Sequence, residues 1–333
     1  MLVAFALSDI GSGITQQKPL ALFHDVHRAM GSEFTIDLYA PNQETADRWM
    51  QMAFEEVDRI EALLSNYQPT SELSRISRDA GIHPVTTDPE TFDFLQTALS
   101  WSSRSDGDFD ITVGPLMRAW GFFNHGRIPT EEELLTLKKQ TGWSNIHLDA
   151  STRTVTFINH SSMELDPGGI GKGYAVDRVV ALLRQQHVSA ALISAGSSTI
   201  YAISAPPGSQ GWPVNIADPA HAGSTLSTIL LADTSLSTSA CTEKFFIKDG
   251  HRYCHILDPH TMHPVENMLQ TTIVAPSATD SDALSTATFV MSPDASARLL
   301  QSCPQTEAVI VSGTPDSPRY RAIHWPNPLH ESK

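Results

Sequence analysis

Cysteine is scarce in this chain of 333 residues, which has only Cys241, Cys254 and Cys303. The three are far apart and odd in number, so they show neither the spacing of a zinc site nor a disulfide framework. Long apolar runs are also missing, because no stretch reaches the roughly 18–20 residues that a membrane helix needs. Internal repeats, low-complexity stretches and long linkers are absent as well. We therefore expect a soluble protein with no transmembrane segment and no division into two independent domains.

Basic residues are few. The 22 Lys and Arg residues are outnumbered by 37 Asp and Glu residues, which gives a formal net charge of −15. The basic residues are scattered and form no stripe, so a nucleic-acid backbone is excluded as a partner. Hydrophobic residues make up 41% of the chain, which is enough for a substantial core.

The N-terminal residues lack the features of an export signal. The apolar stretch from Met1 to Leu7 is short, has no Lys or Arg before it, and soon meets Asp9. A secretory signal needs a basic segment and a longer apolar core. We therefore expect a cytoplasmic protein as the chain is written, or a periplasmic or membrane-anchored one if an export signal has been truncated.

Hydrophobic periodicity predicts strands and helices in blocks without regular alternation, which favours an α+β fold. An amphipathic helix is predicted over 45–64, and Asp88-Pro89 predicts the start of a helix that runs to about Ser103. Thr130 begins a capping box for a helix that ends near Gly142. Further helices are predicted in the second half of 164–183 and at 281–291 and 294–302. Strands are predicted at 34–39, 154–157, 190–194, 213–216, 227–231, 251–257, 271–275 and 307–312.

A glycine-rich stretch, Gly168-Gly-Ile-Gly-Lys-Gly173, stands directly before the helix predicted in 164–183. A glycine loop at a helix N-terminus offers free N–H groups and a partial positive charge to a phosphate, and Lys172 adds a full charge. The stretch fits neither common nucleotide fingerprint: Gly173 replaces the hydroxyl residue of a Walker loop, and Val176 replaces the third glycine of the dinucleotide motif. The alternative is a tight turn packed against a sheet.

A second informative stretch is Asp280 to Thr288. If it opens a helix, Asp282 and Thr286 lie four residues apart on one face. A carboxylate, a hydroxyl and nearby carbonyl groups are the hard oxygen ligands that Mg²⁺ prefers. The alternative is that Asp280, Ser281 and Asp282 only cap the helix.

Four other side chains are candidates for catalysis or ligand binding. His255, placed where a strand ends, can move a proton near neutral pH, although a structural or surface role is open for any of the fourteen histidines. Tyr67 stands in a loop after a long helix and can stack on a flat ligand or anchor the loop. Asp108 and Asp110 can bind a ligand or merely build the turn around them.

Seven motifs, taken in order, resemble the FAD:protein FMN transferase family of the ApbE type. They are Met30-Gly-Ser, the segment from Leu64 to Ser74, Gly107 to Leu116 with Trp120-Gly-Phe, Gly168 to Asp177, Leu236-Ser-Thr-Ser239, His255-Ile-Leu-Asp-Pro259 and Asp282 to Thr288. The resemblance runs from about Met30 to Ser302. It implies an α+β fold with T-fold-like antiparallel sheets and packed helices. The corresponding boundaries are an N-terminal extension at 1–29, one catalytic domain at 30–325 and a C-terminal tail at 326–333.

The resemblance also implies an activity: FAD is split at its pyrophosphate in a Mg²⁺-dependent reaction, FMN is joined to a threonine hydroxyl of an acceptor flavoprotein, and AMP is released. The resemblance implies four groups of site residues. Met30 and Tyr67 would flank the flavin, and the residues in contact with FAD would be Asp108, Phe109, Asp110, Gly168, Lys172 and Ile256. The metal would be held by Asp282, Thr286 and the main-chain oxygens of Gly171 and Ser285, and the catalytic residues would be His255 and Asp282. His255 would take the proton of the acceptor threonine, or orient that residue.

The sequence departs mildly from the family pattern at Pro167 and Gly171, where Leu and Ala are commoner, and more strongly at two further places. Ala195-Gly-Ser-Ser-Thr199 replaces a Gly-Gly-acidic turn, and Ala240-Cys241 stands where glycine and an acidic residue are common. Two alternatives to transfer stay open: an FAD pyrophosphatase that keeps the same site and gives FMN and AMP, and a flavin-binding protein without catalysis, which these departures suggest. The presence of Tyr67 favours transfer over hydrolysis. Modification of the chain itself at Asp282 to Thr288 is disfavoured, because a metal site accounts for the same residues.

Overall fold

The computed structural model describes residues 19–122, 124–158, 162–242 and 244–329. The N-terminal stretch from Met1 to Asp9 therefore lies outside the described residues. One eight-stranded sheet, antiparallel throughout, organises the fold. Its strands in spatial order are β1 (Ala21–Ala29), β2 (Ser32–Ala40), β6 (Ala191–Ala195), β7 (Thr199–Ile203), β10 (Thr234–Ala240), β15 (Met268–Ala275), β16 (Glu307–Thr314) and β17 (Ser317–Ile323).

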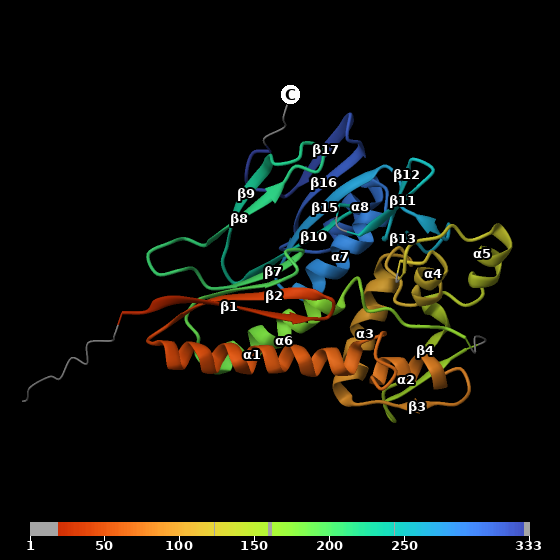
Figure 1. The fold of residues 1–333 in the computed structure, drawn as a ribbon, viewed down its shortest axis with the longest axis horizontal. Helices are drawn as coiled ribbons and strands as arrows, with labels where there is room; N and C mark the ends of the chain where they lie inside the picture. The colour runs from red at the N-terminus through yellow and green to blue at the C-terminus, as the bar shows by residue number, and fades with distance from the viewer. Residues whose placement is uncertain (1–18, 123, 159–161, 243, 330–333) are drawn as a thin grey trace, which may run out of the picture.

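Helices cover one face of this sheet. Helix α1 (Gln43–Leu64) packs on β1 and β2, α6 (Gly171–Gln185) packs on α1, β6 and β7, and α7 (Ala278–Val290) packs on β7, β10 and β15 (Figure 1). Helix α8 (Pro293–Gln301) follows at the β16–β17 end of the sheet. The hairpin of β8 (Trp212–Ala217) and β9 (Thr225–Leu231) packs against apolar residues of β7, β10, β15 and β16 that belong to a second core cluster.

Strand β10 shows how alternation along a strand builds both faces of the sheet. Leu236 belongs to the second core cluster, together with residues of β8 and β9. Ser235 and Ser237, on either side of it, both hydrogen-bond to Ser281 of α7, at 2.8 Å and 2.7 Å between the hydroxyl oxygens. The contact between α7 and the sheet is therefore a layer of buried hydroxyl groups at this point.

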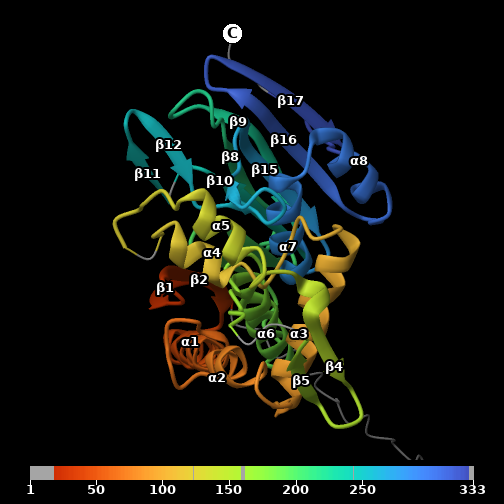
Figure 2. The same cartoon turned by 90° about the vertical axis from the view of Figure 1, so that its right-hand side faces the viewer.

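Smaller elements surround one end of the sheet (Figure 2). Three short strands form a second sheet, and two hairpins, β11–β12 and β13–β14, lie between β10 and β15 in the chain. The elements are α2 (Glu72–Asp79), β3 (Val85–Thr86), α3 (Pro89–Arg104), α4 (Gly114–Ala119), α5 (Glu131–Leu137), the 3₁₀ turn η1 (Trp143–Asn145), β4 (Ile146–Asp149), β5 (Thr154–Phe157), β11 (Phe245–Lys248), β12 (His251–Cys254), β13 (Leu257–Asp258) and β14 (His263–Pro264).

Antiparallel sheets and packed helices confirm the expected α+β fold, and the predicted helix caps are also confirmed. Asp88 accepts a hydrogen bond from the backbone of Glu90 with Pro89 at the first helical position, and Thr130 and Glu133 form the complete capping box. Helix α5 ends at Leu137, so the prediction that it continues to near Gly142 was wrong. The single strand predicted at 251–257 is also wrong, because two short strands belonging to different hairpins replace it.

The two ends of the described chain both pack on the fold. Strand β1 precedes Met30, yet it pairs with β2 along its whole length. At the other end, Trp325 donates a hydrogen bond from its indole N–H to Ser227 Oγ at 3.2 Å, and Asn327 donates to the Thr228 carbonyl at 2.9 Å. The boundaries at 30 and 325 stay predictions. Among the helices that the structure describes, none combines the length and the apolarity that crossing a bilayer requires.

Candidate functional site: a glycine loop joined to a buried carboxylate

The glycine-rich loop and helix α7, which are about a hundred residues apart in the sequence, are in direct contact. The backbone N–H of Gly173 donates to Asp282 Oδ2 at 2.9 Å. A Cβ atom on Gly173 would lie 2.2 Å from the Ala278 carbonyl oxygen, and one on Gly169 would lie 2.9 Å from Thr286 Cγ2. The glycines are therefore needed for close approach of the loop to α7, which puts the predicted phosphate loop beside the predicted metal-binding helix.

Asp177 of α6 connects this helix to α7 through hydrogen bonds. Its carboxylate accepts hydrogen bonds from the backbone N–H groups of Ala278 and Thr279, both at 2.8 Å, and from Thr279 Oγ1 at 2.6 Å. These N–H groups belong to the first turn of α7 and have no partner within the helix. Asp177 lies in the Gly168 to Asp177 motif, but the motif alone predicts no role for it. The structure shows that it fixes the position of α7, and with it Asp282, relative to α6.

Asp282 is the central charged group of the site. Its side chain is buried, and Oδ1 accepts a hydrogen bond from Thr199 Oγ1 at 3.2 Å. Burial raises the pKa of Asp282 above its ordinary value, whereas the positive charge of Lys172 and the two hydrogen bonds oppose that rise. Lys172 itself donates to Ser198 Oγ. A buried carboxylate with a raised pKa is a group that a bound cation stabilises in its charged form.

The alternative that Asp282 caps a helix is wrong, because α7 begins at Ala278 and not at 281. Ser277 is the N-cap, and its hydroxyl accepts a hydrogen bond from the Asp280 N–H at 3.1 Å. Asp280 in turn accepts from the indole N–H of Trp101 at 2.9 Å. Asp282 therefore stands one full turn inside α7 and does not cap that helix; its carboxylate instead accepts the Gly173 N–H in the first turn of α6.

The residues expected to hold a metal divide into two groups. Thr286 lies on the side that faces the loop, and its hydroxyl donates to the Gly169 carbonyl at 3.3 Å. Gly171 is the first residue of α6. The Ser285 carbonyl points the other way and accepts a hydrogen bond from Thr271 Oγ1 at 2.7 Å. A metal that used the Ser285 carbonyl would compete with this hydroxyl, so Asp282 and Thr286 are the better placed ligands.

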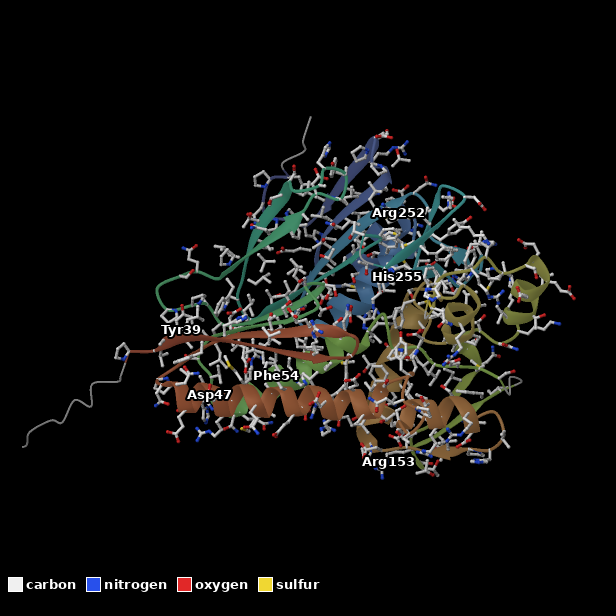
Figure 3. The ribbon with its side chains drawn as sticks, viewed as in Figure 1. Tyr39, Asp47, Phe54, Arg153, Arg252 and His255 are labelled. Atoms are coloured by element: carbon white, nitrogen blue, oxygen red, sulfur yellow. The ribbon has the colours of Figure 1, made fainter. Side chains whose placement is uncertain are left out.

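His255 lies between β12 and β13. Its Nδ1 is 2.8 Å from the Lys244 carbonyl oxygen, which can only accept, so Nδ1 carries the proton and Nε2 keeps a free lone pair. Burial, the charge of Lys244 and the charge of Lys172 lower the pKa of His255 from 6.5 to about 4. Figure 3 labels His255 and also Arg252, which lies on β12. The imidazole is therefore neutral at physiological pH and able to accept a proton at Nε2.

The Asp110 side chain stabilises its own turn through hydrogen bonds. One of its oxygens accepts from the Thr112 N–H at 2.8 Å and from the Thr112 hydroxyl at 2.7 Å, and the other accepts from the Trp143 N–H at 3.0 Å. Burial raises the pKa of Asp110, and these hydrogen bonds oppose the rise. Of the two alternatives for this residue, turn formation is therefore the one that its contacts support.

Asp108 belongs instead to a cluster with Asp258 and His260. One ligand atom from each of the three lies within 4.8 Å of the other two, and His260 Nε2 is 3.5 Å from Asp108 Oδ1. Burial and the neighbouring acidic residues raise the pKa of Asp108 to about 6, and His260 partly offsets the rise. Sequence reasoning missed His260. Its position just after Asp258-Pro259 was the only available signal.

The residues expected at the flavin occupy three different environments. Met30 adopts a positive φ of 52° in the β1–β2 turn, and its Cε would lie 3.5 Å from a Cβ on Gly171. Phe109 is buried beside Gly169, and Ile256 is also buried. Tyr67 is 70% exposed, so its ring does not anchor the loop in the core.

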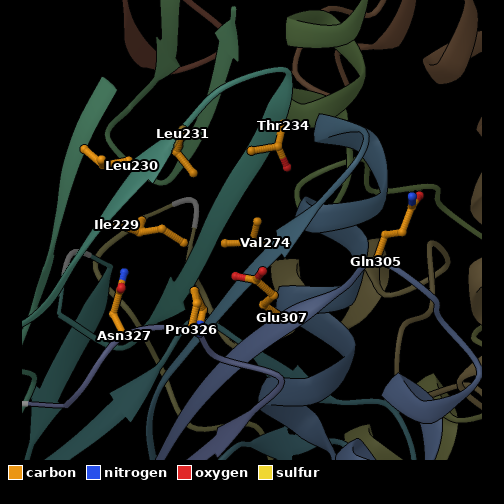
Figure 4. A pocket seen from close by; sticks show the side chains of 9 residues that line it. All are labelled: Ile229, Leu230, Leu231, Thr234, Val274, Gln305, Glu307, Pro326 and Asn327. Atoms are coloured by element: carbon orange, nitrogen blue, oxygen red, sulfur yellow. The ribbon is translucent and has the colours of Figure 1, made fainter. Parts of the chain in front are cut away.

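A separate pocket of about 380 Å³ lies away from this site (Figure 4). Its walls include Ile229, Leu231 and Val274, and the Glu307 side chain points into it. None of the residues discussed above lines this pocket. This pocket is therefore separate from the candidate site at the loop and α7.

The fold and the site define an α+β protein in which a glycine-rich loop adjoins a buried carboxylate. The chain belongs to the ApbE family, whose pattern it matches over residues 30–310. A protein of Klebsiella pneumoniae (strain 342) named FAD:protein FMN transferase is 31% identical over 291 residues, which are 86% of this chain and 88% of that protein. A protein of the same name from Treponema pallidum (strain Nichols) is 30% identical over 277 residues, which are 79% of this chain and 76% of that one.

Solved structures agree with this membership. The crystal structure of the ApbE protein from Thermotoga maritima superposes with a TM-score of 0.84 at 28% identity and covers 91% of this chain and 97% of its own. The flavinyl transferase ApbE of Pseudomonas stutzeri in its apo form gives a TM-score of 0.81, with 92% and 96% covered, and at 23% identity it supports the fold alone.

Proposed function

We propose that this protein is an FAD:protein FMN transferase, which moves FMN from FAD to a threonine hydroxyl of an acceptor protein and releases AMP. The observation that carries the proposal is the direct contact of the glycine loop with Asp282, through the 2.9 Å hydrogen bond from Gly173. A diphosphate needs neutralising positive charge, which Lys172 in the first turn of α6 offers. The N–H groups of Gly168, Ile170, Gly171 and Gly173 are already hydrogen-bonded within the protein. The curated relatives named for this activity span most of the chain.

The junction fits Mg²⁺. Its donors are a buried carboxylate, the Thr286 hydroxyl and the carbonyl groups of the loop, all of which are hard oxygen ligands. Mg²⁺ binds through one or two carboxylates plus substrate phosphates, so Asp282 alone is a sufficient protein carboxylate. We assign Asp282, Thr286 and the main chain at Gly171 as ligands, with Ser285 as the weakest member of the set. A bound Mg²⁺ would supply charge neutralisation at the diphosphate.

Lys172 provides a second positive charge at the same place. It stands in the first turn of α6, where the helix dipole also favours an anion. Its contact with Ser198 holds the ammonium group beside the β6–β7 turn. Lys172 and Gly168 would bind the diphosphate, while Met30, Tyr67, Asp108, Phe109 and Ile256 would orient the rest of FAD.

His255 would accept the proton of the acceptor threonine. An alkyl hydroxyl is a weak nucleophile at neutral pH, so a positioned base typically contributes about 10²–10⁴-fold to the rate. The hydrogen bond from Nδ1 to the Lys244 carbonyl sets the tautomer that leaves Nε2 free. With a pKa of about 4, the imidazole stays unprotonated over the physiological range, although it is a weaker base than an ordinary histidine.

Incubation of the purified protein with FAD, Mg²⁺ and an acceptor domain tests the proposal. We expect a covalently fluorescent acceptor band that is lost on removal of Mg²⁺ and with Asp282→Ala. Hydrolysis is the competing outcome, and it is recognised by rapid formation of free FMN and AMP without acceptor. Tight binding of FAD that stays intact for days with Mg²⁺, and that is indifferent to Asp282→Ala, would instead identify a flavin-binding protein without catalysis.

A further inference from the structure

Two of the three cysteines, Cys241 and Cys254, lie close together in the folded protein. Cys241 follows directly after β10, and Cys254 is the last residue of β12. The β11–β12 hairpin folds the intervening chain back, with Phe245 paired opposite Cys254. Cys241 packs against the apolar cluster to which Cys254, Ile256 and Met268 belong, and the two thiols are close enough to shift each other's pKa.

The two thiols stand in different environments. Cys241 is half-buried, and the hydrogen bond from Cys254 and the nearby positive charge of Arg252 lower its pKa. Cys254 is 2% exposed, and its hydrogen bond to Cys241 together with burial raises its pKa. A partly exposed thiol that favours the thiolate, next to a second thiol, is the arrangement of a redox-active pair. Cys303 is separate from the pair and accepts a hydrogen bond from Arg104 at 2.9 Å.

We propose that Cys241 and Cys254 are a modification site at which a peroxide-class oxidant forms a reversible disulfide. The Cys241 thiolate attacks a peroxide oxygen and the O–O bond breaks, which gives a sulfenic acid and hydroxide. The Cys254 sulfur then attacks the Cys241 sulfur, and the sulfenic oxygen leaves as water with the Cys254 proton. The two thiols together lose two electrons and two protons. An external dithiol reverses the reaction by thiol–disulfide exchange.

Shared packing brings the two cysteines into one neighbourhood. A disulfide requires a sulfur–sulfur separation of about 2.05 Å and side chains that point toward each other. Cys254 belongs to the apolar cluster and Cys241 packs against it, which keeps the pair together. The bond would join the end of β10 to the end of β12 and close segment 242–253 into a loop.

Closing this loop would displace His255, which follows Cys254 directly. Both the His255 N–H, at 3.2 Å, and Nδ1, at 2.8 Å, are held by the Lys244 carbonyl, and Lys244 lies inside the closed segment. A displacement of about 1 Å at a catalytic group can cost about 100-fold in rate. We therefore expect the disulfide to slow FMN transfer. This consequence rests on the proposed function, whereas formation of the disulfide does not.

The first test is a mass measurement on the whole purified protein. After limited hydrogen peroxide and alkylation of the remaining thiols, we expect the loss of two hydrogens, one alkylated cysteine, and a peptide map that links Cys241 to Cys254. Dithiothreitol should restore three alkylated thiols. Cys303→Ser should behave like the parent, and Cys241→Ser and Cys254→Ser should lose the link. A link through Cys303, or Cys241 oxidised to a sulfinic acid while Cys254 stays a thiol, would overturn the proposal.

The second test compares FMN transfer by the reduced and the oxidised protein. We expect oxidation to slow transfer at least about tenfold, and peroxide to leave the rate of Cys241→Ser unchanged. Equal rates for the two forms would overturn the effect on His255. An inactive reduced protein would instead count against the proposed function, and the mass measurement would still decide whether the disulfide forms.

Discussion

Gly173 donates its backbone N–H to Asp282 Oδ2 at 2.9 Å, and no side chain fits at position 173. The hydrogen bond depends on the missing side chain, because only a glycine lets the first turn of α6 approach the Ala278 carbonyl so closely. The phosphate loop and the metal-binding helix are thus joined by a backbone contact. Any change that pushes them apart should affect folding and function together.

Gly173→Ala is therefore expected to lower stability and activity. The added Cβ would lie 2.2 Å from the Ala278 oxygen and 2.8 Å from the Asp282 Cβ, so the helices must shift. Overpacking of this kind costs about 1–3 kcal/mol, which urea unfolding measures. Gly171→Ala is the matched control: its Cβ would meet Pro167 Cβ at 3.2 Å and Met30 Cε at 3.5 Å, and we expect it to stay close to the parent. Equal losses for the two variants would contradict this account of the contact.

Asp282→Asn removes the negative charge of this side chain and keeps its shape. We expect FMN transfer and Mg²⁺ binding to fall at least about 100-fold, since removal of an electrostatic stabiliser from a preorganised site commonly costs 10²–10³-fold. Stability of the metal-free protein should not fall, because burial already disfavours the charged form of Asp282. Calorimetric titration with Mg²⁺ in the presence of FAD, and thermal unfolding without metal, measure the two effects. A variant that unfolds more readily but still binds Mg²⁺ would show that Asp282 is structural.

Asp177→Asn should show the opposite pattern. The carboxylate of Asp177 accepts two backbone hydrogen bonds at the start of α7, and the loss of a helix N-cap typically costs about 0.5–2 kcal/mol. Asp177 makes none of the contacts assigned to FAD or the metal, so the folded fraction should keep most of its activity. Urea unfolding together with transfer rates at low temperature checks both parts. A loss of transfer larger than the loss of folded protein would give Asp177 a direct role.

Sequence patterns predicted the elements with a clear apolar period and missed those without one. Helix α1 was evident from its apolar stripe. Strand β10 was not, because the side chains it turns toward α7 are Ser235, Ser237 and Ser239, and no hydrophobic alternation marks them. Strand β1 was missed because most of its residues are exposed at the edge of the sheet.

The candidate site was predicted in part. The contact between the glycine loop and Asp282 followed from the resemblance to the family, and the structure brings these segments together. The roles of Asp177 and His260 depend on partners more than a hundred residues away, and local sequence carries no sign of such pairs. Cys241 and Cys254 are only thirteen residues apart, and their proximity was missed because that spacing matches no known cysteine motif.

His255 should titrate well below an ordinary histidine. Its pKa in the folded protein is about 4, against 6.5 in an unfolded chain, so between these values the unfolded state binds more protons. Stability should therefore rise with pH across this window, and acidification from pH 7 to 4 should cost on the order of 1–3 kcal/mol through this residue. Comparison of the parent with His255→Gln by urea unfolding at several pH values isolates the contribution.

Removal of a nearby charge should raise the pKa of His255. Lys244 contributes more than Lys172 to its depression, so Lys244→Met should raise the pKa more than Lys172→Met does. Ring resonances in NMR titrations report the value directly, and His255→Gln identifies them among fourteen histidines. A resonance that titrates near 6.5 in the parent would rule out the buried, neutral imidazole on which its role as base depends.

Tyr67→Ala should weaken FAD use without affecting the fold. The ring is 70% exposed, so its removal takes little apolar area out of the core, and the melting temperature should change by only a few degrees. Stacking of an aromatic side chain on a base is worth about 1–3 kcal/mol, and by analogy with the flavin ring system the KM for FAD should rise about 5–100-fold. Tyr67→Phe keeps the ring and should retain a KM near that of the parent. If Tyr67→Phe loses as much as Tyr67→Ala, the hydroxyl and not the ring makes the contact, and Tyr67 does not flank the flavin.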